Sequence, residues 1–224
     1  MFQLRIPDDI PQLLVAVVDA EDVVIQAASD ELRRVCEDAV RRVLTGGMAG
    51  GEPRRRAVRD LLRSGGFKPS GRSKPAQEYL LRTVQEAGVL PAISNAVDLI
   101  NLLSLQSGLP ISLVSLDRVG PQLAIRFGRP GERFVFNRAG QELSLDGLLC
   151  LCAEREGVSE PVGTPVKDSL QAKVDETDRH VVACIYASRT AVPRDELGSW
   201  SEQLAAGFAR HCAAAALRTL VLPE

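Results

Sequence analysis

The sequence predicts an α+β protein, with a mixed or antiparallel sheet flanked by helices. Apolar residues recur at a helical period of about 3.6 in the first half of the chain and at every second position between residues 111 and 187. A helical pattern returns at the C-terminal end. Helices, then strands, then a helix are typical of α+β proteins rather than of regularly alternating parallel units. At 224 residues, 45% of them apolar, the chain can bury a full core.

The N-terminal part combines one strand segment with three amphipathic helices. Residues 13–25 are rich in Val and Ile and predict a strand or hairpin broken at residues 21–22. A helix follows, with Ser29 as its N-cap and apolar residues at helical spacing as far as Val43. Four glycines and a proline in residues 45–53 end it. Two more helices are predicted over residues 54–66 and 76–88, joined by a turn-rich loop.

The stretch "ISNAVDLINLLSLQSGLP" predicts a buried helix that carries three polar residues at a spacing of three. Asn95 is expected to be its N-cap, and the Asp98 carboxylate suits the positive end of the helix dipole. Asn101 lies one turn further along and capping does not explain it. A buried amide without partners costs about 1–3 kcal/mol, so Asn101 belongs either to a polar network or to the wall of a site.

The second half predicts strands and a final helix. The strand candidates are residues 111–117, 122–128, 132–137, 148–152 and 180–187. A long Ala-rich helix is expected over roughly Arg194 to Arg218. Between the last two strand candidates lies a polar loop, residues 161–180, in which Thr164, Lys167, Asp168 and Ser169 bring hydroxyl, ammonium and carboxylate groups together. Such a loop can orient a water or bind part of an amino acid, or it can be a polar hairpin with a turn at residues 175–177.

The composition and the absence of common motifs limit the classes of function that the chain can have. The net charge of −2 excludes a globally basic nucleic-acid binder but not a local basic patch. The five cysteines are odd in number and form no C-x-x-C, so we expect reduced, buried thiols in a soluble, cytoplasmic protein. With only His180 and His211 available, we expect no metal site and no cofactor. We see no secretory signal, no membrane-spanning apolar run and none of the common nucleotide-binding or hydrolase motifs.

A basic segment covers residues 54–74, with eight Lys or Arg against one acid. Clustered arginines suit phosphate contact, so these residues are candidates for RNA binding. They are Arg54, Arg55, Arg56, Arg59, Arg63, Lys68, Arg72 and Lys74. The alternatives are a solvated helix face or ion pairs with the acidic residues between positions 21 and 38.

Several motifs in order resemble the B3/B4 domain of the bacterial phenylalanyl-tRNA synthetase beta subunit. They are "LPAISNAVDLINLLSLQSGLPISLVSLDRV", "GERFVFNRAGQELSLDGLLCL" and "SLQAKVDETDRHVV". The lead-in "KPSGRSKPAQEYLLR" is similar to that of free-standing B3/4 proteins. The resemblance covers roughly residues 67–187. It implies one B3/4-like domain over residues 1–224, with an N-terminal extension (1–66) that includes the basic segment and a C-terminal helix (188–224).

In the synthetase this domain hydrolyses tyrosine wrongly attached to the phenylalanine tRNA. The resemblance therefore implies hydrolysis of a mischarged aminoacyl-tRNA in trans, and no aminoacylation, because the synthetase's catalytic module is absent. It places Ser112 where relatives have a pocket His, and Ser115 where they have an Asp. The implied pocket candidates are Asn101, Ser112, Thr164, Lys167, Asp168 and Ser169. The alternatives are a module that only binds tRNA or a protein, and an amino-acid or small-molecule binding protein that reuses the pocket.

Overall fold

The computed structural model describes residues 2–223, apart from the side chain of Arg72. Its helices are α1 (Asp30–Gly46), α2 (Gly51–Arg63), the 3₁₀ turn η1 (Gly71–Ser73), α3 (Ala76–Ala87), α4 (Asn95–Ser107), α5 (Leu116–Val119) and α6 (Arg194–Cys212). Its strands are β1 (Gln3–Arg5), β2 (Leu13–Glu21), β3 (Ile111–Ser115), β4 (Gln122–Phe127), β5 (Arg133–Val135), β6 (Glu142–Ser144), β7 (Leu149–Arg155), β8 (Val158–Gly163), β9 (Val181–Ser188) and β10 (Ala216–Leu222). The predicted α+β class, with mixed and antiparallel sheets flanked by helices, is confirmed.

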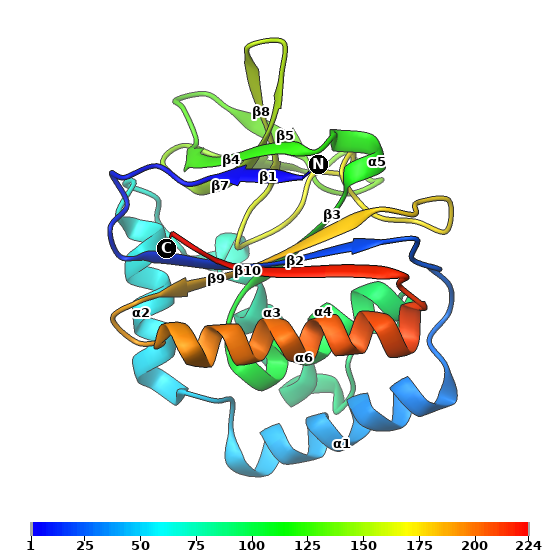
Figure 1. The fold of residues 1–224 in the computed structure, drawn as a ribbon. Coiled ribbons are helices and arrows are strands. Elements are labelled where there is room, and N and C mark those ends of the chain that lie inside the picture. The colour runs from blue at the N-terminus through cyan, green and yellow to red at the C-terminus, as the bar shows by residue number, and fades with distance from the viewer. Residues whose placement is uncertain (1, 224) are drawn as a thin grey trace.

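Two four-stranded sheets lie one above the other, with helices beneath the lower one (Figure 1). The upper sheet has the order β1-β4-β7-β8 and is mixed, because β1 runs parallel to β4 while its other pairs are antiparallel. The lower sheet has the order β10-β2-β9-β3 and is antiparallel throughout. A small β5-β6 ribbon stands apart from both. Helices α1, α4 and α6 lie on the side of the lower sheet that faces away from the upper one (Figure 1).

The central strands β2 and β9 supply side chains to two separate cores. In β2, Leu13, Val15 and Val17 pack between the two sheets, while the alternate residues pack against the helices. Strand β9 divides in the same way, with Tyr186 between the sheets. Because successive side chains of a strand point to opposite faces, a strand covered on both sides reads as one continuous apolar run. The near-continuous run of Val, Ala and Leu in β2 is explained by this double burial.

Helix α4 is capped by Ser94 rather than by Asn95, which corrects the prediction. The Ser94 hydroxyl accepts the backbone N–H of Val97, and Asp98 accepts that of Ile93. Asn95 instead lies inside the first turn, where its buried amide donates to the carbonyls of Val24 and His211. Its side chain therefore ties α4 to the segment after β2 and to the end of α6.

The predicted C-terminal helix is too long. Helix α6 ends at Cys212, and residues 216–222 form β10, which pairs with β2 along its length. Pairing with an apolar central strand overrides the helical tendency of the Ala-rich sequence, because tertiary contacts outweigh intrinsic propensity. Strands β1, β6 and β8 were also absent from the prediction. Among the described residues, no helix has the length and apolar character needed to cross a membrane.

Candidate functional site

A cavity of about 440 Å³ lies beside α4, and we call it the α4 cavity. Its apolar lining includes Ile100, Ile111, Leu113, Val166 and Val174. Its polar lining is formed by Asn101, Asn137, Thr164, Lys167, Asp168 and Lys173. Apolar walls with a few convergent polar groups are typical of small-molecule sites, whose volumes are about 300–1,000 Å³.

The geometry of β3 decides which of its side chains reach this cavity. Ile111 and Leu113 point to the α4 side of the lower sheet, where they line the cavity. Ser112 lies between them, and its alternate neighbour Val114 belongs to the core between the two sheets. Since side chains alternate along a strand, Ser112 points away from the cavity.

Asp168 is the most unusual polar group of the α4 cavity. Its Oδ2 accepts the backbone N–H of Leu113 at 3.1 Å. Its Oδ1 is buried close to the Ser112 hydroxyl and to Gly163. Burial raises the pKa of this carboxyl to about 6, although the Leu113 N–H, Ser112 and Lys173 each lower it. A carboxyl with a pKa near neutrality can accept a proton from water at physiological pH.

Thr164 and Lys167 shape the loop that carries Asp168. The Thr164 hydroxyl accepts the backbone N–H groups of Val166 and Lys167 and donates to the Lys167 carbonyl. The loop is thereby closed into a tight turn by one side chain. The Lys167 ammonium lies 3.8 Å from the centroid of the Phe136 ring and 5.5 Å from that of Tyr79. This is cation–π geometry, and it holds the ammonium at the cavity wall.

The structure brings four of the six pocket candidates together. Asn101, Thr164, Lys167 and Asp168 line the α4 cavity. Ser112 is fully buried behind it, where its Oγ lies 3.1 Å from the Thr164 carbonyl and 3.0 Å from the Tyr186 hydroxyl. Ser169 is also buried, and its hydroxyl accepts the backbone N–H of Gln171. Both serines therefore support the loop rather than line the cavity.

Sequence reasoning missed Lys173 and the β5-β6 ribbon, both of which contribute to the site. Lys173 and Val174 line the cavity from the far end of the polar loop. Phe136 and Asn137 reach it from just after β5. Lys173 could have been predicted, because it is a positive charge next to apolar residues in the polar loop. No local pattern predicts that the residues after β5 lie near α4.

The arginines of α2 are mostly engaged in ion pairs, and their partners are not the acidic residues 21–38. Arg54 is buried and donates to the Ser107 carbonyl and to Glu196. The Glu78 carboxylate forms a bidentate ion pair with the Arg59 guanidinium. The remaining pairs are Arg55 with Glu52 and Glu78, Arg56 with Glu52, and Arg63 with Asp60. These arginines therefore stabilise the packing or surface of α2, which weakens their candidacy for RNA contact.

The rest of the basic segment lies on the loop before α3. Lys68 is exposed and Lys74 is half-buried, and neither is in an ion pair among the described residues, whereas the Arg72 side chain lies outside the part that the structure describes. Lys74 lies between Ser73, which lines a second cavity, and Ala76, which lines the α4 cavity. The chain has four lysines in all, and the other two, Lys167 and Lys173, line the α4 cavity.

Residues 67–199 match the B3/4 domain, and this match spans more than half of the chain. The chain belongs to the B3/4 domain family. A solved structure of an N-terminal fragment of the phenylalanyl-tRNA synthetase beta-subunit from Pyrococcus horikoshii is similar with a TM-score of 0.45 at 9% sequence identity. The similarity covers 99% of this chain and 55% of that one, so this chain spans about half the length of the fragment. The search of curated proteins found no match.

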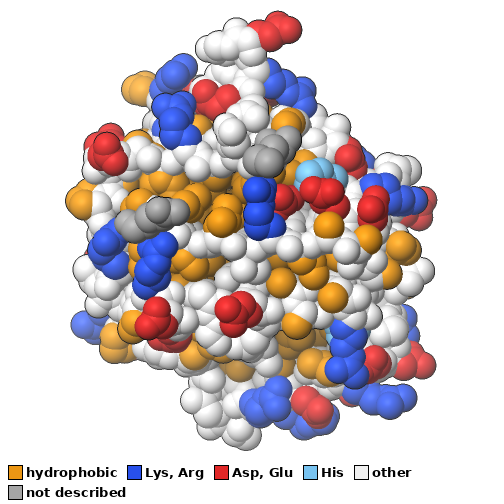
Figure 2. Space-filling model, viewed as in Figure 1, with side chains coloured by type: hydrophobic (Ala, Val, Ile, Leu, Met, Phe, Trp, Pro, Cys, Tyr) orange, Lys and Arg blue, Asp and Glu red, His pale blue; other side chains and the backbone are white. Residues whose placement is uncertain are grey.

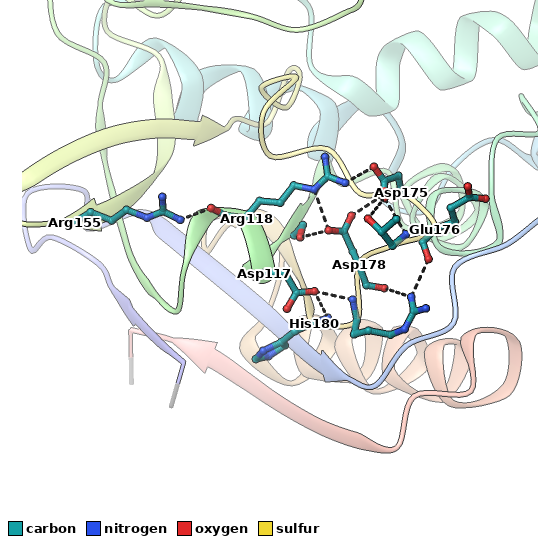
Figure 3. Close-up of polar contacts among 10 residues, drawn as sticks. Asp117, Arg118, Arg155, Asp175, Glu176, Asp178 and His180 are labelled. Carbon is teal, nitrogen blue, oxygen red and sulfur yellow. Dashed lines mark hydrogen bonds and ion pairs between the residues drawn. The ribbon is translucent and has the colours of Figure 1, made fainter.

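In this B3/4 domain a network around Arg118 anchors the far end of the polar loop (Figure 3). Arg118 of α5 pairs with Asp178 at 2.9 Å and with Asp175. Asp178 is buried and also accepts the hydroxyl of Ser115, the residue at the position of the relatives' Asp. The network begins at Asp175, two residues after Lys173, and therefore anchors the segment that carries Lys173 and Val174 at the wall of the α4 cavity.

His180 of the B3/4 domain directly precedes β9 and takes part in a separate cluster with residues of β2 and β10. Its Nε2 lies 2.6 Å from Asp19, which is also paired with Arg218, and 3.9 Å from Glu21. Asp19, Glu21 and His180 are the group among the described residues whose ligand atoms are close enough to hold a metal ion. The guanidinium of Arg218 already neutralises Asp19, so the arrangement suits an ion-pair network.

The cysteines of the B3/4 domain are reduced, as the sequence predicts. All five cysteines are free thiols, and burial raises the pKa of Cys36 and Cys152 to about 11 each. Since these thiols stay protonated near neutral pH, they behave as small apolar groups.

Figure 2 shows Lys and Arg side chains interspersed with Asp and Glu over the face shown, around an apolar area, with no broad region of one charge.

Proposed function

We propose that this B3/4 protein hydrolyses the ester bond of a mischarged aminoacyl-tRNA in trans, with the α4 cavity as its amino-acid site. The observation that carries the proposal is the Asp168 carboxyl, whose pKa burial raises to about 6, at the wall of a cavity whose other walls are largely apolar. The apolar walls suit the side chain of an apolar amino acid. The family membership supports a role related to tRNA synthetases.

The proposed reaction needs no metal and no covalent intermediate. A water oxygen attacks the ester carbonyl while Asp168 accepts one of the water protons. The tetrahedral intermediate then expels the ribose oxygen, which takes up the proton. The products are a free amino acid and a tRNA with a free terminal hydroxyl. Holding the already activated ester beside an oriented water supplies the rate increase through proximity.

Contact with the tRNA is assigned to the lysines rather than to the α2 arginines. Lys68 and Lys74 lie on the loop that leads to the cavities and are not in ion pairs among the described residues. A lysine is a compact point charge on a flexible stem, which suits contact with a passing phosphate.

The test is deacylation of a panel of mischarged tRNAs by the full chain. Wild type is expected to hydrolyse at least one of them faster than the spontaneous rate, and Asp168→Asn is expected to lose that activity. Glu202→Gln, an exposed change on α6, is the matched control and should keep full activity. Spontaneous rates for the whole panel would refute the enzymatic proposal.

A salt titration tests the assignment of the lysines. Replacing Lys68 and Lys74 by Ala is expected to weaken tRNA binding and to lower the salt slope by about 1–2, because each lost phosphate contact removes about 0.7–0.9 from it. The control is Arg42→Ala with Arg189→Ala, which removes the same charge from exposed positions that line neither cavity. An equal loss of affinity in both double variants would reject the assignment.

The ion pairing of the α2 arginines favours a second candidate function, a protein that binds an amino acid or another small molecule without RNA. Fewer free cations on α2 mean fewer phosphate contacts. That reading predicts a measurable affinity for a free amino acid and no salt-dependent binding of tRNA.

A further inference from the structure

A second cavity of about 440 Å³ adjoins the α4 cavity, and we call it the hairpin cavity because the β5-β6 ribbon forms most of it. Its lining consists of Ser73, Phe136, Gln141, Glu142, Leu143, Ser144 and Lys167. Phe136 and Lys167 also line the α4 cavity, so the two cavities share a wall. A ligand with two parts can occupy both at once only by passing this pair of side chains.

The two cavities differ in chemistry. The α4 cavity is lined largely by apolar side chains, whereas the hairpin cavity presents two serine hydroxyls, an amide and a carboxylate beside one aromatic ring. Hydroxyl and amide groups can both donate and accept, and a carboxylate accepts, as the edge of a nucleobase and the hydroxyls of a ribose require. An aromatic ring offers a stacking surface to any base, and base–aromatic stacking is sequence-tolerant.

Lys167 lies at the boundary between the α4 cavity and the hairpin cavity. Its ammonium lies over the Phe136 ring and within cation–π distance of the Tyr79 ring, so the charge is held at the shared wall. A positive charge fixed at that point stabilises negative charge that develops on a ligand atom between the cavities. Lys74 follows Ser73 directly, which places a further cation next to the hairpin cavity.

We propose that the hairpin cavity binds the terminal adenosine of the aminoacyl-tRNA, and that Lys167 lies at the ester bond between adenosine and amino acid. This inference rests on the proposed function. Every aminoacyl-tRNA ends in an adenosine whose ribose carries the ester, so the amino acid and the nucleoside are adjacent parts of one ligand. The apolar and the polar cavity, joined at a cationic wall, match those two parts. The 5′-phosphate then points to Lys74.

The binding test uses a hydrolysis-resistant ligand, 3′-aminoacylamino-3′-deoxyadenosine, and the corresponding amino-acid amide without the nucleoside. Calorimetry on the full chain is expected to show about tenfold tighter binding of the nucleoside ligand, the gain that one stacked base supplies. Ser144→Trp fills the hairpin cavity from an exposed position and should abolish this difference while leaving the affinity for the amide unchanged. Ser199→Trp, on the exposed surface of α6, is the control and should behave as wild type. Equal affinities for the two ligands in wild type would overturn the inference.

The kinetic test separates this inference from the proposed function. If mischarged tRNA is hydrolysed, Ser144→Trp should raise KM about tenfold for the tRNA substrate but not for an amino-acid ethyl ester. Lys167→Met should lower kcat by about 10²-fold or more, as the loss of a group that stabilises an oxyanion does. Hydrolysis with an unchanged KM in Ser144→Trp overturns the inference alone. Nucleoside-dependent binding without any hydrolysis supports the inference and rejects the enzymatic function.

Discussion

The hydroxyl of Tyr186 lies 3.0 Å from the Oγ of Ser112, between the two sheets and on the opposite face of β3 from the α4 cavity. Both residues are fully buried. Burial raises the pKa of Tyr186 well above its usual value, so its hydroxyl stays protonated and can donate. The position that the sequence resemblance matches to a pocket His is therefore occupied in this chain by half of a buried hydroxyl pair.

Ser112→Ala is expected to destabilise the fold by about 1–3 kcal/mol, because it leaves the Tyr186 hydroxyl buried without this partner. Tyr186→Phe removes the other hydroxyl. In the double variant the loss should be smaller than the sum of the two single losses, since neither group is left unpaired. Urea unfolding of the four proteins measures the coupling. Strict additivity would show that the two hydroxyls do not stabilise each other.

Ser112→His should not create a working pocket. The site is closed by Tyr186 and by the Thr164 carbonyl, so a larger ring is expected to cost about 1–3 kcal/mol through overpacking. The measurement is the unfolding midpoint together with deacylation of the tRNA panel. A stable variant with new hydrolytic activity would show that residue 112 can reach the ligand after all.

Asp168→Asn should stabilise the protein above pH 6. Burial raises the pKa of the Asp168 carboxyl in the folded protein from its ordinary value of 3.8 to about 6, so the folded state holds the proton more tightly and stability falls as pH rises from about 4 to 6. A neutral amide does not suffer this loss, which is worth about 1.4 kcal/mol per pKa unit. The gain in Tm of the variant should vanish near pH 4. If the gain is the same at every pH, the titration of Asp168 is not its cause.

The catalytic role proposed for Asp168 has its own pH signature. Because the base form is required, kcat/KM for deacylation should rise through about pH 6 and then level off. Greater stability with lost activity in Asp168→Asn is the pattern expected of a strained functional group. A flat pH profile between 5 and 8 would exclude this carboxylate as the base.

Arg54 and Arg56 are neighbours in the sequence but should behave differently. Arg54→Ala removes two hydrogen bonds of a buried guanidinium and is expected to cost about 1.5–3 kcal/mol. Arg56→Ala removes only an exposed pair with Glu52 and should change stability by less than about 0.5 kcal/mol. Thermal and urea unfolding test this contrast, and similar losses in both variants would contradict it.

Local patterns were sufficient for much of the fold. The period-2 segments located β3, β4, β5, β7 and β9 because buried strands impose alternation on their own sequence. The N-cap at Ser29 was equally local, since its hydroxyl accepts the N–H of Leu32 only three residues away. The polar loop was selected as a candidate site loop from the side chains gathered in it, and three of them line the α4 cavity. The division of the chain into residues 1–66, 67–187 and 188–224 stays a prediction, apart from β10 at its end.

The errors came from partners that are distant in the sequence. The charges on α2 are neutralised in part by Glu78 and Glu196, and nothing near residue 54 indicates that Glu196 lies beside it. Residues 216–222 form a strand because β2, almost 200 residues earlier, offers an unpaired edge. The orientation of Ser112 could have been inferred from the sequence, because the alternation of β3 already indicated that residues 112 and 113 face opposite sides.

The position of β3 at the border of the lower sheet has a consequence for how copies of this protein behave in solution. An edge strand has unpaired backbone N–H groups that can pair with a strand of another molecule, and such pairing is a common start of aggregation. Here Asp168 takes the N–H of Leu113, and the Ala172 carbonyl takes that of Ser115. At the opposite border Arg194 occupies the carbonyls of Val221 and Pro223. The loop that lines the α4 cavity thus also blocks intermolecular growth of the sheet at this edge.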